Sequence, residues 1–207
     1  EKTLFYFSRI LKSGDSLLFL LNNLLDLSKL ESGKMNFEMS QNDLKNIVYI
    51  VIKEFNSAIV KKGVVLSIKE SLLPTTVFCD FNKIAQVIRN LLSNAIIYTA
   101  KDKGISISFE LSEIPLVNRH SELKMIPAVI TSVKDQGVGI PDAELDTVFD
   151  KFIQSSKTNT GAGGTGLGLA ICKEIVEAHK GIIWAENNAE EGSTVNFLLP
   201  INHERYW

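Results

Sequence analysis

Residues 161 to 171 read GAGGTGLGLAI, with five glycines in eight positions followed by an apolar run typical of a helix start. Glycine loses more backbone entropy on folding than any other residue, so this density implies that backbone N–H groups must approach something closely. At the start of a helix that partner is often a phosphate. The stretch therefore predicts a phosphate-binding loop or, as the simpler alternative, a glycine-rich loop without a ligand.

Two common phosphate-binding motifs do not fit this loop. Residues 161–166 match G-x-G-x-x-G, and Glu186 follows Gly166 by 20 residues, as in a dinucleotide-binding fingerprint. That fingerprint needs a buried strand before the first glycine, whereas the polar segment QSSKTNT stands there. A P-loop needs a lysine and a serine or threonine after the glycines, and none follows. We therefore expect neither a Rossmann site nor a P-loop.

Charge and cysteine content limit the partners and the cellular compartment that can be expected for this chain. The 22 Lys and Arg residues nearly balance the 24 Asp and Glu residues, so nucleic acid and anionic lipid are not expected partners. Cys79 and Cys172 lack metal-ligand spacing and favour two free thiols in a reducing compartment over a disulfide. No apolar run reaches the roughly 18 residues of a membrane span. We expect a cytoplasmic chain, with any membrane attachment in segments outside it.

The first 30 residues carry an apolar stripe at helical spacing. Leucines recur every seven residues, at Leu4, Leu11, Leu18 and Leu25. A single helix cannot bury a stripe this wide, so a bundle helix is expected over residues 1–34, ending near Gly33. Its partner is a second copy of the chain or a helix outside it. Alternating helix and strand patterns predict an α/β domain over residues 35–207.

The elements of this domain follow from periodicity and turn residues. Asp43 and Asp80 are expected to cap helices that run to residues 62 and 99. A short helix is expected around residues 144–149 and a longer one over 167–180. Strands are predicted over 35–40, 64–70, 75–80, 105–111, 128–135, 181–187 and 193–200. The polar stretch between the two central strands, residues 112–127, resembles an insertion.

Three further motifs bear on what the glycine-rich loop binds. In NLLSN, Asn90 and Asn94 project from one helix face. In DQGVGIP, Asp135 ends a strand, where it can accept a hydrogen bond from an exocyclic amine above a tight glycine turn. In VFDKF, Phe149 and Phe152 precede a polar segment and could anchor a lid. Each motif has a simpler alternative: solvated asparagines, a plain turn and core packing, respectively.

In this order and with these gaps, the four motifs resemble the N, G1, F and G2 boxes of the sensor histidine kinase ATP-binding domain. Residues 1–35 resemble the second helix of that family's dimerisation bundle, so the resemblance covers nearly the whole chain. It implies a two-layer α/β sandwich, a mixed sheet packed on helices in the Bergerat-type ATP-binding fold. It also implies ATP and Mg²⁺ as ligands, a homodimer through the bundle helix and a response-regulator receiver domain as partner.

The resemblance also implies roles for individual residues. Asp135 would accept from the adenine amino group, with Ser193 helping to hold a water against it, and Asn94 would supply an oxygen to Mg²⁺. The base pocket would be shaped by Tyr98, Gly137, Gly139 and Ile140. The phosphates would lie near Asn90 and the backbone of Gly164, Thr165, Gly166, Leu167 and Gly168. Residues 153–163 would form a mobile lid, with Phe152 and Lys157 contributing to the site.

The resemblance indicates phosphoryl transfer rather than hydrolysis. Related ATPases use a glutamate to activate water, but Asn90 occupies the matching place, and an amide cannot act as that base. The phosphoryl acceptor would be a histidine on the first bundle helix, followed by a response-regulator aspartate. His120, His179 and His203 lack the acceptor's context and are expected to be solvated. The chain is therefore interpreted as a kinase fragment that binds ATP without phosphorylating itself.

Two departures keep an alternative open. Ile97 and Gln154 stand where the family often has lysine and arginine near the phosphates, although Lys151 or Lys157 could supply a replacement charge. Glutamine at 154 also resembles hybrid kinases, which carry a receiver domain further along the chain. The alternative function is a non-catalytic ATP-binding or dimerisation module.

Overall fold

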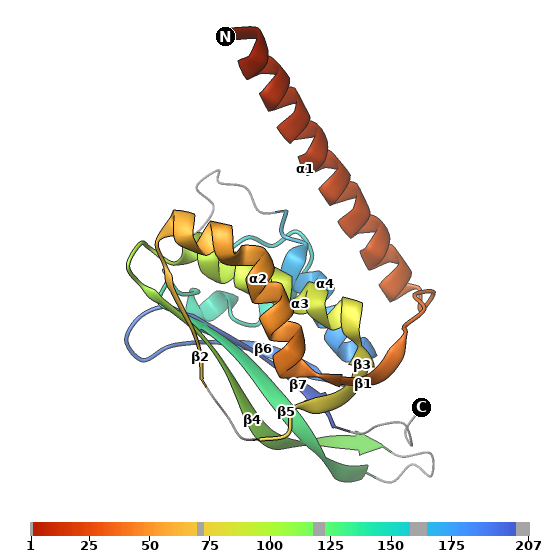
Figure 1. The fold of residues 1–207 in the computed structure, drawn as a ribbon. Coiled ribbons are helices and arrows are strands. Elements are labelled where there is room, and N and C mark those ends of the chain that lie inside the picture. The colour runs from red at the N-terminus through yellow and green to blue at the C-terminus, as the bar shows by residue number, and fades with distance from the viewer. Residues whose placement is uncertain (1, 70–72, 118–122, 158–164, 202–207) are drawn as a thin grey trace.

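A computed structural model describes residues 2–69, 73–117, 123–157 and 165–201. Three helices, α2 (Leu44–Lys62), α3 (Phe81–Tyr98) and α4 (Gly168–Ala178), pack on one face of a five-stranded sheet. Within the described ranges no helix covers the opposite face (Figure 1). This arrangement confirms the predicted two-layer α/β sandwich.

The sheet is mixed, as expected. Its strands run in the order β2 (Val65–Ile68), β4 (Gly104–Val117), β5 (Leu123–Asp135), β7 (Ser193–Pro200) and β6 (Ile182–Asn187). Strand β2 pairs parallel to β4, and all other neighbours pair antiparallel. Inward-facing residues of β4 such as Ile105 and Ile107 pack against buried positions of α3 such as Ile88 in one continuous core.

Both predicted helix caps are confirmed. The Asp43 carboxylate accepts from the Lys45 N–H at 3.0 Å, and that of Asp80 accepts from the Lys83 N–H at 3.0 Å. Each bond satisfies a donor that the first helical turn leaves unpaired. The caps fix where α2 and α3 begin, and therefore which turns of α3 face the end of β5.

Strand β1 (Met39–Asp43) begins four residues later than predicted and pairs with β3 (Thr76–Asp80) rather than with the main sheet. The segment before it makes tertiary contacts instead of strand pairs. The Glu38 N–H donates to the Asp80 carboxylate at 2.7 Å, and the Phe37 ring packs edge-on against His179 at 5.2 Å. These contacts hold the connection between the first helix and the sandwich.

Helix α1 (Lys2–Glu31) projects from the sandwich, as Figure 1 shows, and contacts it near its C-terminal end. Leu27 is buried in the common core, and α1 also contacts α4. Apolar side chains remain exposed along the rest of the helix, among them Phe7, Ile10, Leu11, Leu17, Leu18, Leu21, Leu24 and Leu25. Among the described helices, none is both long and apolar enough to span a membrane.

The two central strands, predicted over 105–111 and 128–135, extend further into the polar stretch at residues 112–127 than expected. Strands β4 and β5 continue through it as a hairpin that pairs Pro115 with Met125 and Glu113 with Pro127. Both prolines lie beyond the residues that pair with β2 and β7, where strands tolerate proline. Likewise, the short helix expected around 144–149 forms two separate 3₁₀ turns, Asp142–Glu144 and Thr147–Phe149.

The two cysteines are free and buried, which confirms the expectation of thiols over a disulfide. Burial raises the pKa of both Cys79 and Cys172 to about 12. The thiolate is the reactive form of cysteine, and a pKa this high keeps both side chains protonated at neutral pH. Both residues therefore pack as small apolar side chains.

The prediction that His179 is solvated was wrong. Its side chain is 1% exposed, its Nε2 accepts from the Asp80 N–H at 3.0 Å, and its Nδ1 donates to the Ile175 carbonyl at 2.7 Å. Burial lowers the pKa of the imidazole, which favours the neutral form that these two bonds require. The burial depends on Asp80 and Phe37, which are distant in sequence. His120 and His203 lie outside the described residues.

Protonation of His179 is expected to destabilise the fold. Because the pKa of the folded state is lowered, the stabilising contribution is present in full above the unfolded pKa of about 6.5. It is lost as the pH falls from there through the lowered pKa, by at most about 1.4 kcal/mol per pH unit. Urea unfolding at pH 7.5 and pH 5.5 should therefore show a larger loss in the parent chain than in His179→Gln, which retains an acceptor. Equal losses would contradict this prediction.

Candidate functional site

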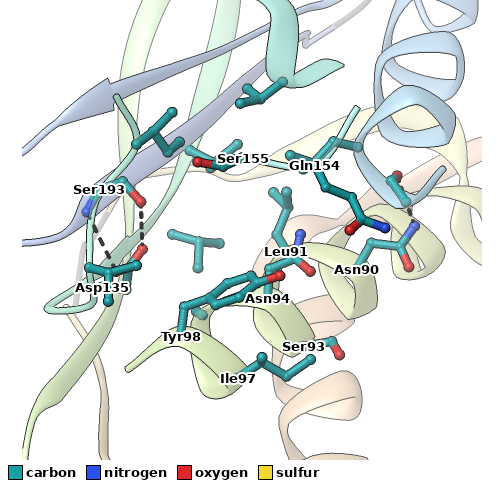
Figure 2. A pocket seen from close by; sticks show the side chains of 18 of the residues that line it. Asn90, Leu91, Ser93, Asn94, Ile97, Tyr98, Asp135, Gln154, Ser155 and Ser193 are labelled. Carbon is teal, nitrogen blue, oxygen red and sulfur yellow. Dashed lines mark hydrogen bonds between the residues drawn. The ribbon is translucent and has the colours of Figure 1, made fainter. Parts of the chain in front are cut away.

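A cavity opens between α3, the C-terminal end of β5 and the N-terminus of α4. Its lining residues include many of those predicted from sequence: Asn90, Asn94, Tyr98, Asp135, Gly139, Ile140, Thr165, Gly166, Gly168 and Ser193. Figure 2 shows Asp135 and Ser193 at one end, Asn90 and Gln154 at the other, and Tyr98 and Asn94 between them. Motifs separated by about a hundred residues therefore meet around one space.

Asp135 is held rigidly at its end of the cavity. It is 7% exposed, and its carboxylate accepts from the Ser193 hydroxyl at 2.9 Å and the Gly137 N–H at 2.7 Å. Burial raises the pKa of this carboxyl, while the bonds from Ser193 and Gly137 oppose that rise. A carboxylate oxygen accepts more than one hydrogen bond, so Asp135 can still accept from a ligand amine. Ser193, which the resemblance implies would help to hold a water against this carboxylate, also contacts it directly.

The segment after β5 forms the floor beside Asp135. Val138, Gly139 and Ile140 line the cavity, whereas Gly137 lies beneath it and forms an isolated bridge with Thr99. Because Tyr98 precedes Thr99 at the end of α3, this bridge brings an aromatic ring to the same part of the cavity. The resulting space, bordered by an aromatic ring and by the backbone of Val138, Gly139 and Ile140, can accommodate a planar base.

Asn90 and Asn94 lie one turn apart on α3 and both line the cavity. The Asn90 amide donates to the Gly168 carbonyl at 3.2 Å and so connects α3 to the start of α4. For Asn94 no hydrogen bond to another described side chain or backbone group is found, and its amide lies beside the Tyr98 ring in Figure 2. The two amides, predicted as a pair, have different surroundings.

The glycine-rich loop reaches the cavity at the start of α4. Among the described residues no side chain caps the first helical turn, although the N–H of Leu167, just before it, donates to the Thr165 hydroxyl at 3.2 Å. Gly166 has a φ of +67°, and a Cβ there would lie 2.7 Å from the Phe152 carbonyl carbon. Only glycine allows this approach, which the Phe152 N–H completes by donating to the Gly166 carbonyl at 2.9 Å. An open helix N-terminus bordered by such a loop can bind an anion.

Some predicted residues lie away from the cavity. Leu167 is 1% exposed and packs in the core, and Gly164 lies outside the described residues. Phe149 is buried, whereas Phe152 is 63% exposed and does not line the cavity. The two aromatics of VFDKF therefore have different surroundings, Phe149 in the core and Phe152 at the surface.

The end of the cavity next to α4 carries little charge. Among the described residues, no lysine or arginine lines it, whereas the uncharged Ile97 and Gln154 are lining residues. The Lys157 ammonium donates to the Val138 carbonyl at 3.3 Å, at the border of the cavity. The apolar wall residues Val133 and Val195 were not identified from sequence, because strand alternation alone marks them as ordinary core positions.

Comparisons with known proteins agree with this geometry. Residues 79–203 match the model of the family described as histidine kinase-, DNA gyrase B- and HSP90-like ATPases. The chain is 37% identical over 190 residues to the sensor histidine kinase WalK of Bacillus subtilis, covering 90% of this chain and 29% of WalK. It therefore spans less than a third of that relative's length.

Two solved structures share the fold. The nucleotide-free catalytic domain of histidine kinase ThkA superposes with a TM-score of 0.67 at 29% identity, covering 82% of this chain and 99% of ThkA's domain. A longer ThkA chain in complex with the response regulator TrrA superposes with a TM-score of 0.70 at 24% identity, covering 97% of this chain and 52% of that one.

Proposed function

Since this chain belongs to the family of histidine kinase-, DNA gyrase B- and HSP90-like ATPases, we propose that it binds ATP as the catalytic portion of a two-component sensor histidine kinase. The observation that carries the proposal is the cavity itself. It combines a buried acceptor, Asp135, at one end with an uncapped, glycine-bordered helix start at the other.

The proposed placement of ATP follows the chemistry of the two ends. The adenine amino group donates to Asp135, while Tyr98 and the segment from Gly139 to Ile140 enclose the ring. The phosphates lie against the backbone of Thr165, Gly166 and Gly168, where N–H groups and the helix dipole favour anions. The carboxylate at one end would repel phosphates, and the N–H groups at the other end would attract them. These groups therefore support this orientation of ATP over the reverse orientation.

Phosphoryl transfer, rather than hydrolysis, is the proposed reaction. Asp135 is the only carboxylate among the described lining residues, and it lies at the base end. Asn90, near the phosphates, donates a hydrogen bond and cannot accept a proton from water. The γ-phosphoryl therefore passes to a histidine outside this chain and from there to a response-regulator aspartate. Positioning and charge neutralisation dominate such a transfer.

Asn94 is proposed to supply a neutral oxygen ligand to a Mg²⁺ ion that is otherwise held by phosphates and water, a set of ligands that suits this ion. Asn94→Ala is expected to lower the affinity for an ATP analogue about tenfold with Mg²⁺ and to change it little without Mg²⁺, which corresponds to one lost ligand. Asn94→Asp, which keeps an oxygen, should retain the dependence on Mg²⁺. Calorimetric titration of all three chains measures this, and an undiminished Mg²⁺ effect in Asn94→Ala would contradict the assignment.

A second candidate, a non-catalytic ATP-binding or dimerisation module, is favoured by the uncharged phosphate end. Ile97 and Gln154 line it in place of cations. Titration with an ATP analogue tests binding, and addition of ATP with a separate histidine-bearing bundle helix distinguishes the candidates. The kinase requires transfer of labelled phosphate to that helix, whereas binding without transfer supports the second candidate. Failure to bind the analogue would contradict both the kinase and the ATP-binding module and would leave only the dimerisation module.

The remaining proposals concern assembly. We assign residues 1–34 to the dimerisation bundle and 35–207 to the catalytic domain, with a homodimer through the exposed apolar face of α1. A receiver domain is the proposed partner, in keeping with the ThkA complex with TrrA. The cytoplasm is the proposed location, with membrane attachment only through segments outside this chain.

A further inference from the structure

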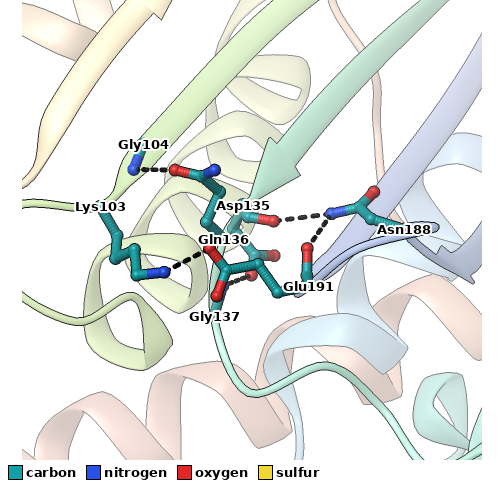
Figure 3. Close-up of polar contacts among 7 residues, drawn as sticks. All are labelled: Lys103, Gly104, Asp135, Gln136, Gly137, Asn188 and Glu191. Carbon is teal, nitrogen blue, oxygen red and sulfur yellow. Dashed lines mark hydrogen bonds and ion pairs between the residues drawn. The ribbon is translucent and has the colours of Figure 1, made fainter.

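The turn that joins β6 to β7, residues 188–192, lies against the end of β5 (Figure 3). It is preceded by Asn187, the last residue of β6, and starts with Asn188. The sequence motifs did not identify these two asparagines. Both, however, contact the backbone of the segments that carry the base end of the cavity.

Asn188 holds the residue that would recognise the base. Its amide nitrogen donates to the Asp135 backbone carbonyl at 2.7 Å and to the Glu191 carbonyl at 2.9 Å. Its amide oxygen accepts from the Thr194 hydroxyl at 2.6 Å, so the side chain is fixed from both sides. Since Ser193, the first residue of β7, bonds to the Asp135 carboxylate, the turn and the residue after it hold both the backbone and the side chain of Asp135.

Asn187 holds the floor of the cavity. Its amide oxygen accepts from the Ile140 N–H at 2.9 Å, and its amide nitrogen donates to the Ile140 carbonyl at 2.6 Å and to the Asp142 carboxylate at 2.8 Å. The side chain thus pairs with both backbone groups of Ile140, as a neighbouring strand would. Ile140 belongs to no strand or helix, so this pair replaces regular backbone pairing.

We propose that Asn187 and Asn188 are positioning residues that fix Ile140 and Asp135 and thereby set the preference of this cavity for adenine over guanine. The inference rests on the proposed ATP-binding function. Adenine presents an amino donor where guanine presents a carbonyl acceptor. When the Asp135 carboxylate is held in place, the guanine carbonyl would face it as a second acceptor, which disfavours guanine. A carboxylate that is free to shift can avoid this repulsion and so discriminates less between the two bases.

The experiment compares affinities for non-hydrolysable ATP and GTP analogues by calorimetry in the parent chain and in Asn188→Ala, Asn187→Ala and Asn42→Ala. Asn42 is the matched control, because its amide likewise joins two backbone segments, donating to the Cys79 carbonyl at 2.9 Å, but in the small β1–β3 sheet. Urea unfolding of each chain records the loss of stability that any of these substitutions causes.

Asn188→Ala is expected to lower the ATP-analogue affinity about tenfold and to reduce the ATP-to-GTP ratio by a similar factor, with a smaller effect in Asn187→Ala. Asn42→Ala should lose stability and keep the ratio. An unchanged ratio in Asn188→Ala, or an equal change in Asn42→Ala, overturns this inference while leaving the proposed function intact. Failure of the parent chain to bind the ATP analogue overturns the proposed function, and with it the inference.

Discussion

Asp135→Asn is expected to weaken binding of an ATP analogue about 100-fold, or by roughly 3 kcal/mol, the largest effect on binding expected of a substitution that leaves the fold in place. The Asp135 carboxylate accepts from Ser193 and Gly137 and, in the proposed complex, from the adenine amino group. An asparagine has only one acceptor oxygen. Its amino group would face at least one of these donors, leaving two donors opposed in a buried site.

The same substitution is expected to spare the fold. Burial raises the pKa of Asp135 in the folded state, so its stabilising contribution is present below its unfolded pKa of about 3.9 and is lost as the pH rises through the raised value. At neutral pH the ionised carboxylate therefore opposes folding, and asparagine removes that charge without changing the shape.

Calorimetric titration and urea unfolding separate these two effects. The unfolding free energy of Asp135→Asn should approach or exceed that of the parent chain as the pH rises from about 4 to 7. Binding by Asp135→Asn as tight as by the parent would contradict the assignment of the base end. A variant that does not fold would leave the binding prediction to Ser193→Ala, which removes one of the same hydrogen bonds and should weaken binding about tenfold.

Gly192→Ala is expected to cause the largest loss of stability, about 3 kcal/mol or more. Gly192 has a φ of +80°, and a Cβ there would lie 2.1 Å from the Asp135 carbonyl oxygen and 2.7 Å from the Gly137 nitrogen. Both contacts are with backbone, so the clash is relieved only by separating the β6–β7 turn from the end of β5. Nucleotide binding should be lost with it, because that turn holds Asp135.

Gly63→Ala is the matched control. Gly63 also has a positive φ, +72°, but the atoms nearest to a Cβ there belong to the flexible Lys101 side chain, the first of them at 3.0 Å. Its expected cost is about 1 kcal/mol, the ordinary penalty of the left-handed conformation. Urea denaturation of both variants measures the difference, and equal losses would show that the close approach at Gly192 does not constrain the fold.

The amino-acid sequence by itself determined the order of the elements and several of the residues that line the candidate cavity. Asp43 and Asp80 cap their helices as predicted, because capping depends on residues only two or three positions away. Asn90 and Asn94 share a face because helical geometry places residues four apart on one side. Such signals are local, so they can be read without knowing what packs nearby.

Only the tertiary structure decided the features that depend on distant neighbours. His179 is buried and accepts a hydrogen bond from the N–H of Asp80, which is 99 residues away in sequence. The residues close to His179 in the sequence do not predict this contact. Phe152 is exposed while Phe149 is buried, although one motif carries both. Asn187 and Asn188 look like turn residues until β6 and β7 bring them against the end of β5. Interactions between residues close in sequence determine the helices and strands. Which side chains form the site depends on burial and on hydrogen bonds between separate segments, because both depend on the position of a segment far away in sequence.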